Sequence, residues 1–127
     1  DMALDALAKL LLDRRINGVP VVDDAANLKG VVTVTDLFRF IDESKEKALG
    51  SGRAWIEVLR ERQKNSCVRD IMTQQVYTVT RSTAVPEVLE LVMRHDIHTI
   101  PVLSDDKKDV VGIIGRHDIV LAFLRNQ

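Results

Sequence analysis

The sequence contains little of several residue types, and each shortage excludes a class of protein. It has one cysteine in 127 residues, so an internal disulfide is impossible and a reducing compartment is favoured. Aromatic residues make up 4% of the chain, and the single tyrosine and single tryptophan cannot form a base-stacking platform. The net charge of −1 provides no global field toward nucleic acid or an anionic membrane.

Membrane and targeting signals are also missing from the sequence. No apolar run approaches the roughly 20 residues needed to span a bilayer. The first residues lack the basic start and apolar stretch of a signal peptide. Hydrophobic residues still make up 46% of the chain, which is enough for a core. We therefore expect a cytoplasmic α/β protein without nucleic-acid or membrane contact from this segment.

An internal repeat is the most informative pattern in the chain. Residues 3–22 align with residues 84–103, and after a one-residue insertion residues 30–41 align with residues 112–123. The residues that recur in register are Pro20 and Pro101, Gly30 and Gly112, and Asp36 and Asp118. A proline, a glycine and an aspartate coinciding within matching apolar patterns indicate a duplication.

Each copy predicts a helix, two strands and a closing helix. Apolar residues with the i, i+3, i+4, i+7 spacing of a helix face begin at Leu4 and at Val85. Thr83 is the expected N-cap of the second of these helices, with Pro86 in its first turn. Strands are expected at 19–22, 30–33, 100–103 and 110–114, and short closing helices from about Asp36 and Asp118.

The two copies differ before their first helix. Residues 76–79 of the second copy alternate as a strand does, whereas the matching stretch of the first copy would precede residue 1. We therefore expect the first unit to lack its opening strand here. The predicted organisation is a first unit at 1–41, a connector at 42–66 and a second unit at 67–127.

The connector contains an amphipathic pattern from Arg53 to Lys64, with Trp55, Ile56 and Leu59 on one side. Two interpretations remain open for this helix. It is either a connector packed on one unit or a contact for a partner or a second copy through Trp55.

Thr33 and Asp36 lie three residues apart where a strand meets a helix. By spacing alone, two interpretations are open. Either Thr35 or Asp36 is simply the N-cap of the helix, or Thr33 and Asp36 form part of a binding site, because a carboxylate there can accept hydrogen bonds from a ligand. The second copy has Gly115 in place of the threonine, so its Asp118 has lost one hydroxyl partner.

Several segments resemble a tandem pair of CBS (cystathionine beta-synthase) domains. The matching segments are 17–23 followed by 30–36, and 68–73 followed by 100–102 and 112–118. The resemblance implies two β-α-β-β-α units of α/β (α+β) class, with their sheets packed face to face and their helices outside. It also implies clefts that bind AMP, ADP, ATP or S-adenosylmethionine, association into a homodimer, and an effector domain beyond this segment.

The same resemblance implies a set of ligand-binding residues. The stretch from Thr33 to Asp36 is similar to one nucleotide site of the AMP-activated protein kinase gamma subunit, where this pair binds ribose. The other implied positions are Thr78, Val79, Thr99 and Pro101 as a wall, Thr35, His98, Arg116 and His117 near phosphate, and Asp118 in a second cleft. Because Gly115 and the missing strand both weaken that second cleft, we expect one competent site, at Thr33 and Asp36.

No other chemistry has support in the sequence. His95 and His98 lack a third ligand of clear spacing for zinc, and no ordered Ser/His/Asp or Cys/His constellation is present. We therefore expect no metal, no cofactor and no enzyme activity. The predicted function is regulatory binding of AMP, ADP or ATP, and the alternatives are a structural dimerisation module with empty clefts or an S-adenosylmethionine sensor.

Overall fold

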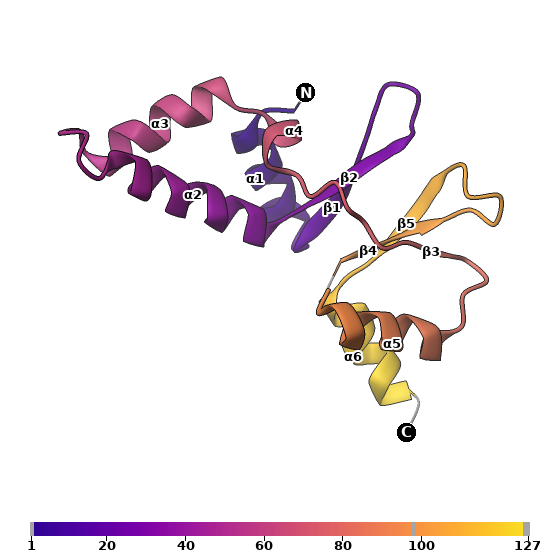
Figure 1. The fold of residues 1–127 in the computed structure, drawn as a ribbon. Helices are drawn as coiled ribbons and strands as arrows, with labels where there is room; N and C mark the ends of the chain where they lie inside the picture. Colours follow the sequence, from indigo (N-terminus) through magenta and orange to yellow (C-terminus); the bar gives the residue numbers. More distant parts are fainter. Residues whose placement is uncertain (1, 98, 126–127) are drawn as a thin grey trace.

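The chain forms two small α/β units, and a helical hairpin extends from the first of them (Figure 1). The computed structural model describes residues 2–97 and 99–125. The first part comprises α1 (Leu4–Arg14), β1 (Gly18–Val22), β2 (Leu28–Thr33), α2 (Val34–Ala48), α3 (Trp55–Asn65) and α4 (Val68–Ile71). The second part comprises β3 (Val79–Thr80), α5 (Val85–His95), β4 (Ile100–Leu103), β5 (Val110–Ile114) and α6 (Arg116–Arg125).

The backbone confirms the duplication that the sequence predicts. Helices α1 and α5 both end in a left-handed residue, Arg15 with φ 53° and Asp96 with φ 50°. The hairpins β1–β2 and β4–β5 are both antiparallel. The register of each hairpin shifts at the matching position, between Val21 and Val22 in the first copy and between Val102 and Leu103 in the second. Matching irregularities at matching positions show that the copies share local geometry as well as an apolar pattern.

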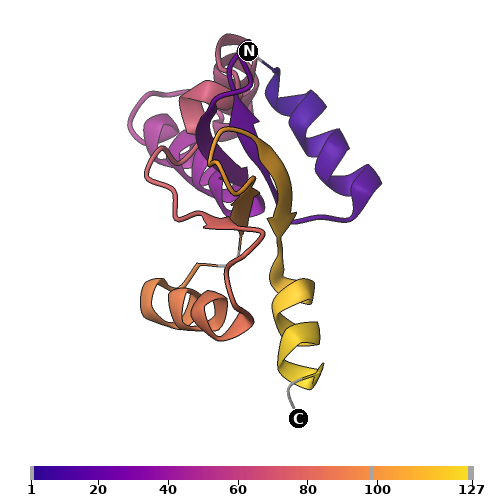
Figure 2. The same cartoon turned by 90° about the vertical axis from the view of Figure 1, so that its right-hand side faces the viewer.

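The sheets occupy the middle of the molecule and the helices lie outside. In Figure 1, α1 to α4 lie on one side of the two hairpins and α5 and α6 lie on the other, and Figure 2 shows the same separation after a quarter turn. The first sheet has the order β1–β2, and the second has the order β3–β4–β5 with β3 parallel to β4. This is the predicted arrangement of a tandem pair, with β1 paired on one side only.

The first unit holds the main hydrophobic core. Its buried side chains are Leu4, Leu7, Leu11, Val32, Phe40 and Val68. Val68 comes from α4, so a segment that follows the hairpin in sequence packs back on the first unit. The next residues are fixed there as well, because Thr73 and Val31 exchange two backbone hydrogen bonds of 2.8 and 2.9 Å.

A cross-hairpin contact holds α3 against α2. The guanidinium of Arg62 donates to the Ser44 hydroxyl at 2.6 Å and to the Phe40 carbonyl at 3.0 Å, and it lies 4.2 Å from the centroid of the Phe40 ring. Ser44 is fully buried, so this polar group depends on α3 for one of its partners. The connector therefore packs on the first unit through side-chain bonds as well as apolar contact.

Three sequence predictions about local structure are wrong. The strand expected at 76–79 is reduced to Val79–Thr80, because Thr73 is bonded to β2 and the chain must cross to the other sheet before it can pair with β4. The N-cap of α5 is Ala84, since the Thr83 hydroxyl accepts the N–H of Thr80 instead. The closing helix of the first unit is not short, because α2 continues to Ala48, inside the predicted connector.

The connector helix also differs from its predicted face. It begins at Trp55, and its buried residue is Val58, whereas Trp55 is 43% exposed and Ile56 is 40% exposed. Leu59 packs against the first core as predicted.

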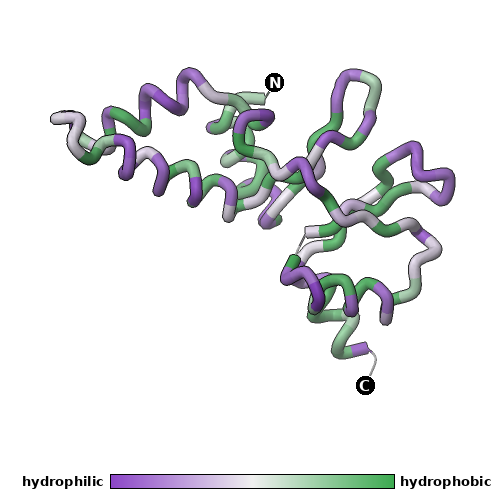
Figure 3. The backbone as a smooth tube through the Cα atoms, in the orientation of Figure 1, coloured by the Kyte–Doolittle hydropathy of each residue, from purple (hydrophilic) through white to green (hydrophobic). Residues whose placement is uncertain are grey.

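The helices of the second unit leave much apolar surface exposed. None of residues 85–95 and 116–125 is buried. The large exposed side chains on these helices are Val85, Met93, Val120, Leu121, Phe123 and Leu124. Figure 3 shows hydrophobic segments along both helices and hydrophilic residues in the loop between β4 and β5.

Candidate functional site

The junction between β2 and α2 is a capping box. Thr33 is the N-cap of α2; its N–H donates to Oδ2 of Asp36 at 2.8 Å, and its hydroxyl donates to the same oxygen at 3.2 Å. The Asp36 N–H donates in turn to the Thr33 hydroxyl at 3.4 Å. A threonine and an acidic residue three positions apart favour this arrangement. The junction is therefore a helix cap, but the N-cap is Thr33 and not Thr35 or Asp36, the two residues that the sequence suggested for it.

The second oxygen of Asp36 has partners from two other places in the chain. Oδ1 accepts Nη1 of Arg39 at 2.9 Å and the hydroxyl of Thr73 at 3.4 Å. Asp36 is only 3% exposed, whereas the Arg39 side chain is 55% exposed. The carboxylate is thus buried with compensating hydrogen bonds, as a buried charge requires.

A cavity of about 410 Å³ opens beside this carboxylate and is lined by both units. The first unit and the segment after α4 contribute Asn17, Val31, Thr33, Val34, Thr35, Asp36, Phe38, Arg39, Thr73, Gln75, Val76 and Tyr77. The second unit contributes Asp96, Ile97, Thr99 and Arg116. The volume suits a small organic ligand, since such sites are commonly about 300–1,000 Å³.

The two units approach closely at one edge of this cavity. A Cβ atom added to Gly18 would lie 2.9 Å from the Thr33 methyl and 3.0 Å from the Thr99 side chain. Only glycine leaves room for both threonines here. Thr33 and Thr99 belong to different units, so Gly18 allows them to line one cavity together.

An aromatic pair borders the cavity on the side of the second unit. The rings of Tyr77 and His95 are stacked, with centroids 4.0 Å apart and planes inclined by 18°. Tyr77 lines the cavity and is 43% exposed, so part of its ring is accessible to a ligand. Stacking of this kind holds the Tyr77 side chain in place.

The structure brings together five of the residues named from the sequence. Thr33, Thr35, Asp36, Thr99 and Arg116 line the cavity. The predicted positions Thr78, Val79, Pro101, His117 and Asp118 are not among its lining residues, and Val79 and Pro101 are buried. His98 lies outside the described residues.

Sequence reasoning missed several lining residues. The two most able to bind a ligand are Arg39, which carries a positive charge, and Tyr77, which has an aromatic ring and a hydroxyl. Arg39 follows Asp36 by three positions on one helix, a spacing at which opposite charges pair, so this contact had a sequence signal. Tyr77 precedes the predicted Thr78 by one position. Its orientation depends on the crossing between the sheets, which no local pattern reveals.

Asp118 repeats the cap with fewer partners. Its Oδ2 accepts the N–H of Gly115 at 2.8 Å, the same bond length as at the first junction, but the residue is exposed. With Gly115 in the place of a threonine, no side-chain hydroxyl accompanies this carboxylate. The two junctions therefore share a backbone geometry and differ in side-chain support and burial.

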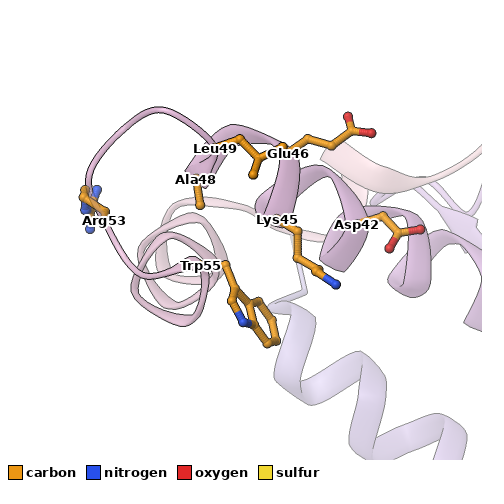
Figure 4. A pocket seen from close by; sticks show the side chains of 7 residues that line it. All are labelled: Asp42, Lys45, Glu46, Ala48, Leu49, Arg53 and Trp55. Atoms are coloured by element: carbon orange, nitrogen blue, oxygen red, sulfur yellow. The ribbon is translucent and has the colours of Figure 1, made fainter.

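A second, shallower cavity of about 590 Å³ lies at the tip of the α2–α3 hairpin. Figure 4 shows its lining, in which the side chain of Lys45 on α2 points toward the Trp55 indole on α3. The Lys45 ammonium is 5.8 Å from the ring centroid, within the range of a cation–π contact. Trp55 therefore has a partner within the chain, while the partner-contact interpretation of its exposed face stays a prediction.

Metal and membrane features are limited among the described residues. Within residues 2–97 and 99–125, no group of three or more His, Cys, Asp or Glu side chains could hold a metal ion. In the same part of the chain, no helix is long and apolar enough to cross a membrane.

Comparison with known proteins places these features in context. A family model described as "CBS domain" matches residues 1–43 and 68–125. The meiotically up-regulated gene 70 protein of Schizosaccharomyces pombe is 33% identical over 116 residues, which cover 85% of this chain and 14% of that protein. The chain spans only 14% to 20% of three of the curated relatives that it matches.

Two solved structures with bound ligands have a similar fold. The CBS domain pair of protein MJ0100 in complex with 5′-methylthioadenosine and S-adenosyl-L-methionine is 28% identical, with a TM-score of 0.72 and coverage of 100% of this chain and 86% of that one. CBSX2 of Arabidopsis thaliana in complex with AMP is 27% identical, with a TM-score of 0.72 and coverage of 98% and 84%.

Proposed function

Because the chain belongs to the CBS-domain family, we propose that it is a regulatory module that binds AMP, ADP or ATP in the cavity between its two units. The observation that carries the proposal is the buried carboxylate of Asp36 at the edge of a cavity lined by both units. The similar structures that hold AMP, or S-adenosyl-L-methionine with 5′-methylthioadenosine, support an adenosine-containing ligand.

The ribose would bind at Asp36. A vicinal diol offers two hydroxyl donors, and an ionised carboxylate accepts hydrogen bonds through both oxygens. Hydrogen bonds with an ionised acceptor are the stronger kind, which suits a small ligand in an open cavity. The Thr33 hydroxyl beside the carboxylate supplies one further polar partner.

The phosphate side would lie near the start of α2 and the Arg116 side chain. The N-terminus of a helix carries partial positive charge and unpaired N–H groups, so it favours an anion. Thr35 and Arg116 line the cavity and add a hydroxyl and a cation. The adenine would occupy the apolar part of the lining, where Val76, Tyr77 and Ile97 lie.

Ligand binding would be transmitted because the cavity draws on both units. A ligand that contacts both stabilises one relative orientation of the units over others, and this difference in affinity is what shifts an equilibrium. The output would pass to an attached effector domain or a dimer partner. The proposal assigns a binding role in the cytoplasm and no catalytic step, with units at 1–41 and 67–127 and a connector at 42–66.

Calorimetry with AMP, ADP, ATP and S-adenosylmethionine tests this proposal. We expect binding of at least one adenine nucleotide, with most of the affinity lost in Asp36→Asn and little lost in Asp118→Asn. Asparagine keeps one oxygen for the capping N–H while it removes the charge, so the variant separates binding from folding. Absence of binding by the wild-type chain at high ligand concentration would refute the proposal.

A structural role without a ligand is the second candidate. The observation that favours it is the set of internal donors on Asp36, which satisfies the carboxylate without a ligand. Under this alternative, the pair associates as a homodimer through its outer helices, where Met93 is 83% exposed and Phe123 is 58% exposed. A homodimer is expected under either function, and analytical ultracentrifugation measures it.

A further inference from the structure

The partners of the Asp36 carboxylate conflict with its proposed use. Among the residues that the structure describes, four donors reach its two oxygens: the N–H and the hydroxyl of Thr33, the guanidinium of Arg39, and the hydroxyl of Thr73. An ionised carboxylate offers about four lone-pair sites. A ribose diol therefore cannot bind to this carboxylate until some of the internal donors leave.

The donors differ in how easily they can leave. The Thr33 N–H is fixed at the end of β2, and its bond to Oδ2 is short at 2.8 Å. The Thr73 hydroxyl belongs to a residue whose backbone is bonded to β2. The Arg39 guanidinium, by contrast, lies at the end of a long side chain that is 55% exposed and has several rotatable bonds. The guanidinium is thus the partner that a ligand can displace at low cost.

We propose that Arg39 occupies Oδ1 of Asp36, one of the two oxygens that the ribose needs, when no nucleotide is bound, and moves to the phosphate of the nucleotide when a ribose hydroxyl replaces it. This inference rests on the proposed function, since it needs a ribose at Asp36. Arg39 would then be a specificity-determining residue. It lowers the affinity for any ligand that carries a ribose, because the ribose must displace it, and it raises the affinity only for a ligand that also carries a phosphate.

The surroundings of Arg39 support this exchange. The residue lines the cavity together with Thr35 and Arg116, so a released guanidinium stays in the same space as the ligand. Arg39 and Asp36 also border a third cavity, of about 280 Å³, which Glu43 and Asp70 line as well. Glu43 already pairs with Arg62 at 3.3 Å, and Asp70 accepts the N–H of Cys67 at 2.8 Å. Because these two carboxylates already have partners, the displaced guanidinium would pair with the ligand phosphate.

Removal of the Arg39 charge distinguishes adenosine from AMP. In Arg39→Met, adenosine no longer has to displace a guanidinium, so its affinity should rise about 2- to 5-fold, as expected from the loss of one exposed ion pair. AMP loses the phosphate contact in the same variant. The preference for AMP over adenosine should therefore fall about tenfold, since a hydrogen bond to a charged group contributes roughly that much.

A matched control removes the same charge elsewhere. Arg94 pairs with Glu90 at 2.8 Å on an exposed face of α5, outside the cavity lining. Arg94→Met should leave both affinities unchanged, which accounts for any general effect of net charge on an anionic ligand.

Calorimetry of wild type, Arg39→Met and Arg94→Met with adenosine and AMP decides the question. Tighter adenosine binding with a reduced AMP preference, only in Arg39→Met, supports the inference. Unchanged or weaker adenosine binding overturns it, and tighter adenosine binding with an unchanged AMP preference overturns the transfer to phosphate. Failure of the wild type to bind either ligand is a different result, because it refutes the proposed function itself.

Discussion

Replacement of Asp36 by alanine is expected to destabilise the fold, independently of any ligand. The substitution removes the acceptor of the Thr33 N–H, and loss of such a cap costs about 1 kcal/mol. It also removes the ion pair with Arg39, worth about 0.5–1 kcal/mol because the arginine is exposed, and it leaves the Thr73 hydroxyl without this acceptor. The free energy of unfolding should fall by about 2–3 kcal/mol in total.

Asp118→Ala is the matched comparison, because it deletes the same cap in the second unit. Its carboxylate is exposed and accepts the N–H of Gly115 at 2.8 Å, so the expected loss is about 0.5–1 kcal/mol. Urea unfolding followed by circular dichroism and by Trp55 fluorescence measures both variants. Equal losses in the two variants would refute the argument that the burial and additional partners of Asp36 set its contribution.

Two further predictions concern α4 and Thr73, which pack against the first unit before the chain enters the second. In Gly30→Ala, the new Cβ would lie 2.5 Å from the Thr73 carbonyl oxygen, so the free energy of unfolding should fall by about 1–3 kcal/mol in urea titrations. Gly112→Ala, where the nearest atom is 3.9 Å away, should change little, and a similar loss in both would contradict the steric argument. The hydrogen bond from the Cys67 N–H, and then that from its side chain, lower the pKa of Asp70 below its ordinary value of 3.8. Asp70 therefore stabilises the fold above pH 3.8 and loses this contribution as pH falls through its lower folded pKa, so Asp70→Asn should destabilise the chain at neutral pH and approach wild type in acid. A stability difference that is constant with pH would contradict this assignment.

The sequence predicted the elements that repeat and the junction that carries the candidate site. Helical spacing located α1 and α5, and the β-branched runs located all four strands of the two hairpins, because each of these signals is local. The junction of Thr33 and Asp36 was located by the same local signals, although the sequence suggested Thr35 or Asp36 as the N-cap and the structure has Thr33 in that place.

What the sequence could not predict depends on contacts between distant segments. The truncation of β3 follows from the bonds between Thr73 and Val31, which lie 42 positions apart by their numbers. The packing of α4 on the first core, and the resulting place of Tyr77 at the cavity, follow from the same bridge. The ion pair between Asp36 and Arg39 could have been predicted from their helical spacing, but the hydrogen bond from the Thr73 hydroxyl to the same carboxylate oxygen could not.

The return of α4 to the first unit limits how the two units can move. The chain is anchored on the first unit through Thr73 and enters the second sheet at Val79, so residues 74–78 form the whole covalent span between the anchors. Five residues reach at most about 17 Å when fully extended. Gln75, Val76 and Tyr77 lie within this span and also line the cavity, so a ligand there would touch the hinge itself. Any rotation of the units would then change the ligand's own binding surface, and occupancy and orientation would be coupled without a relay through the rest of the fold.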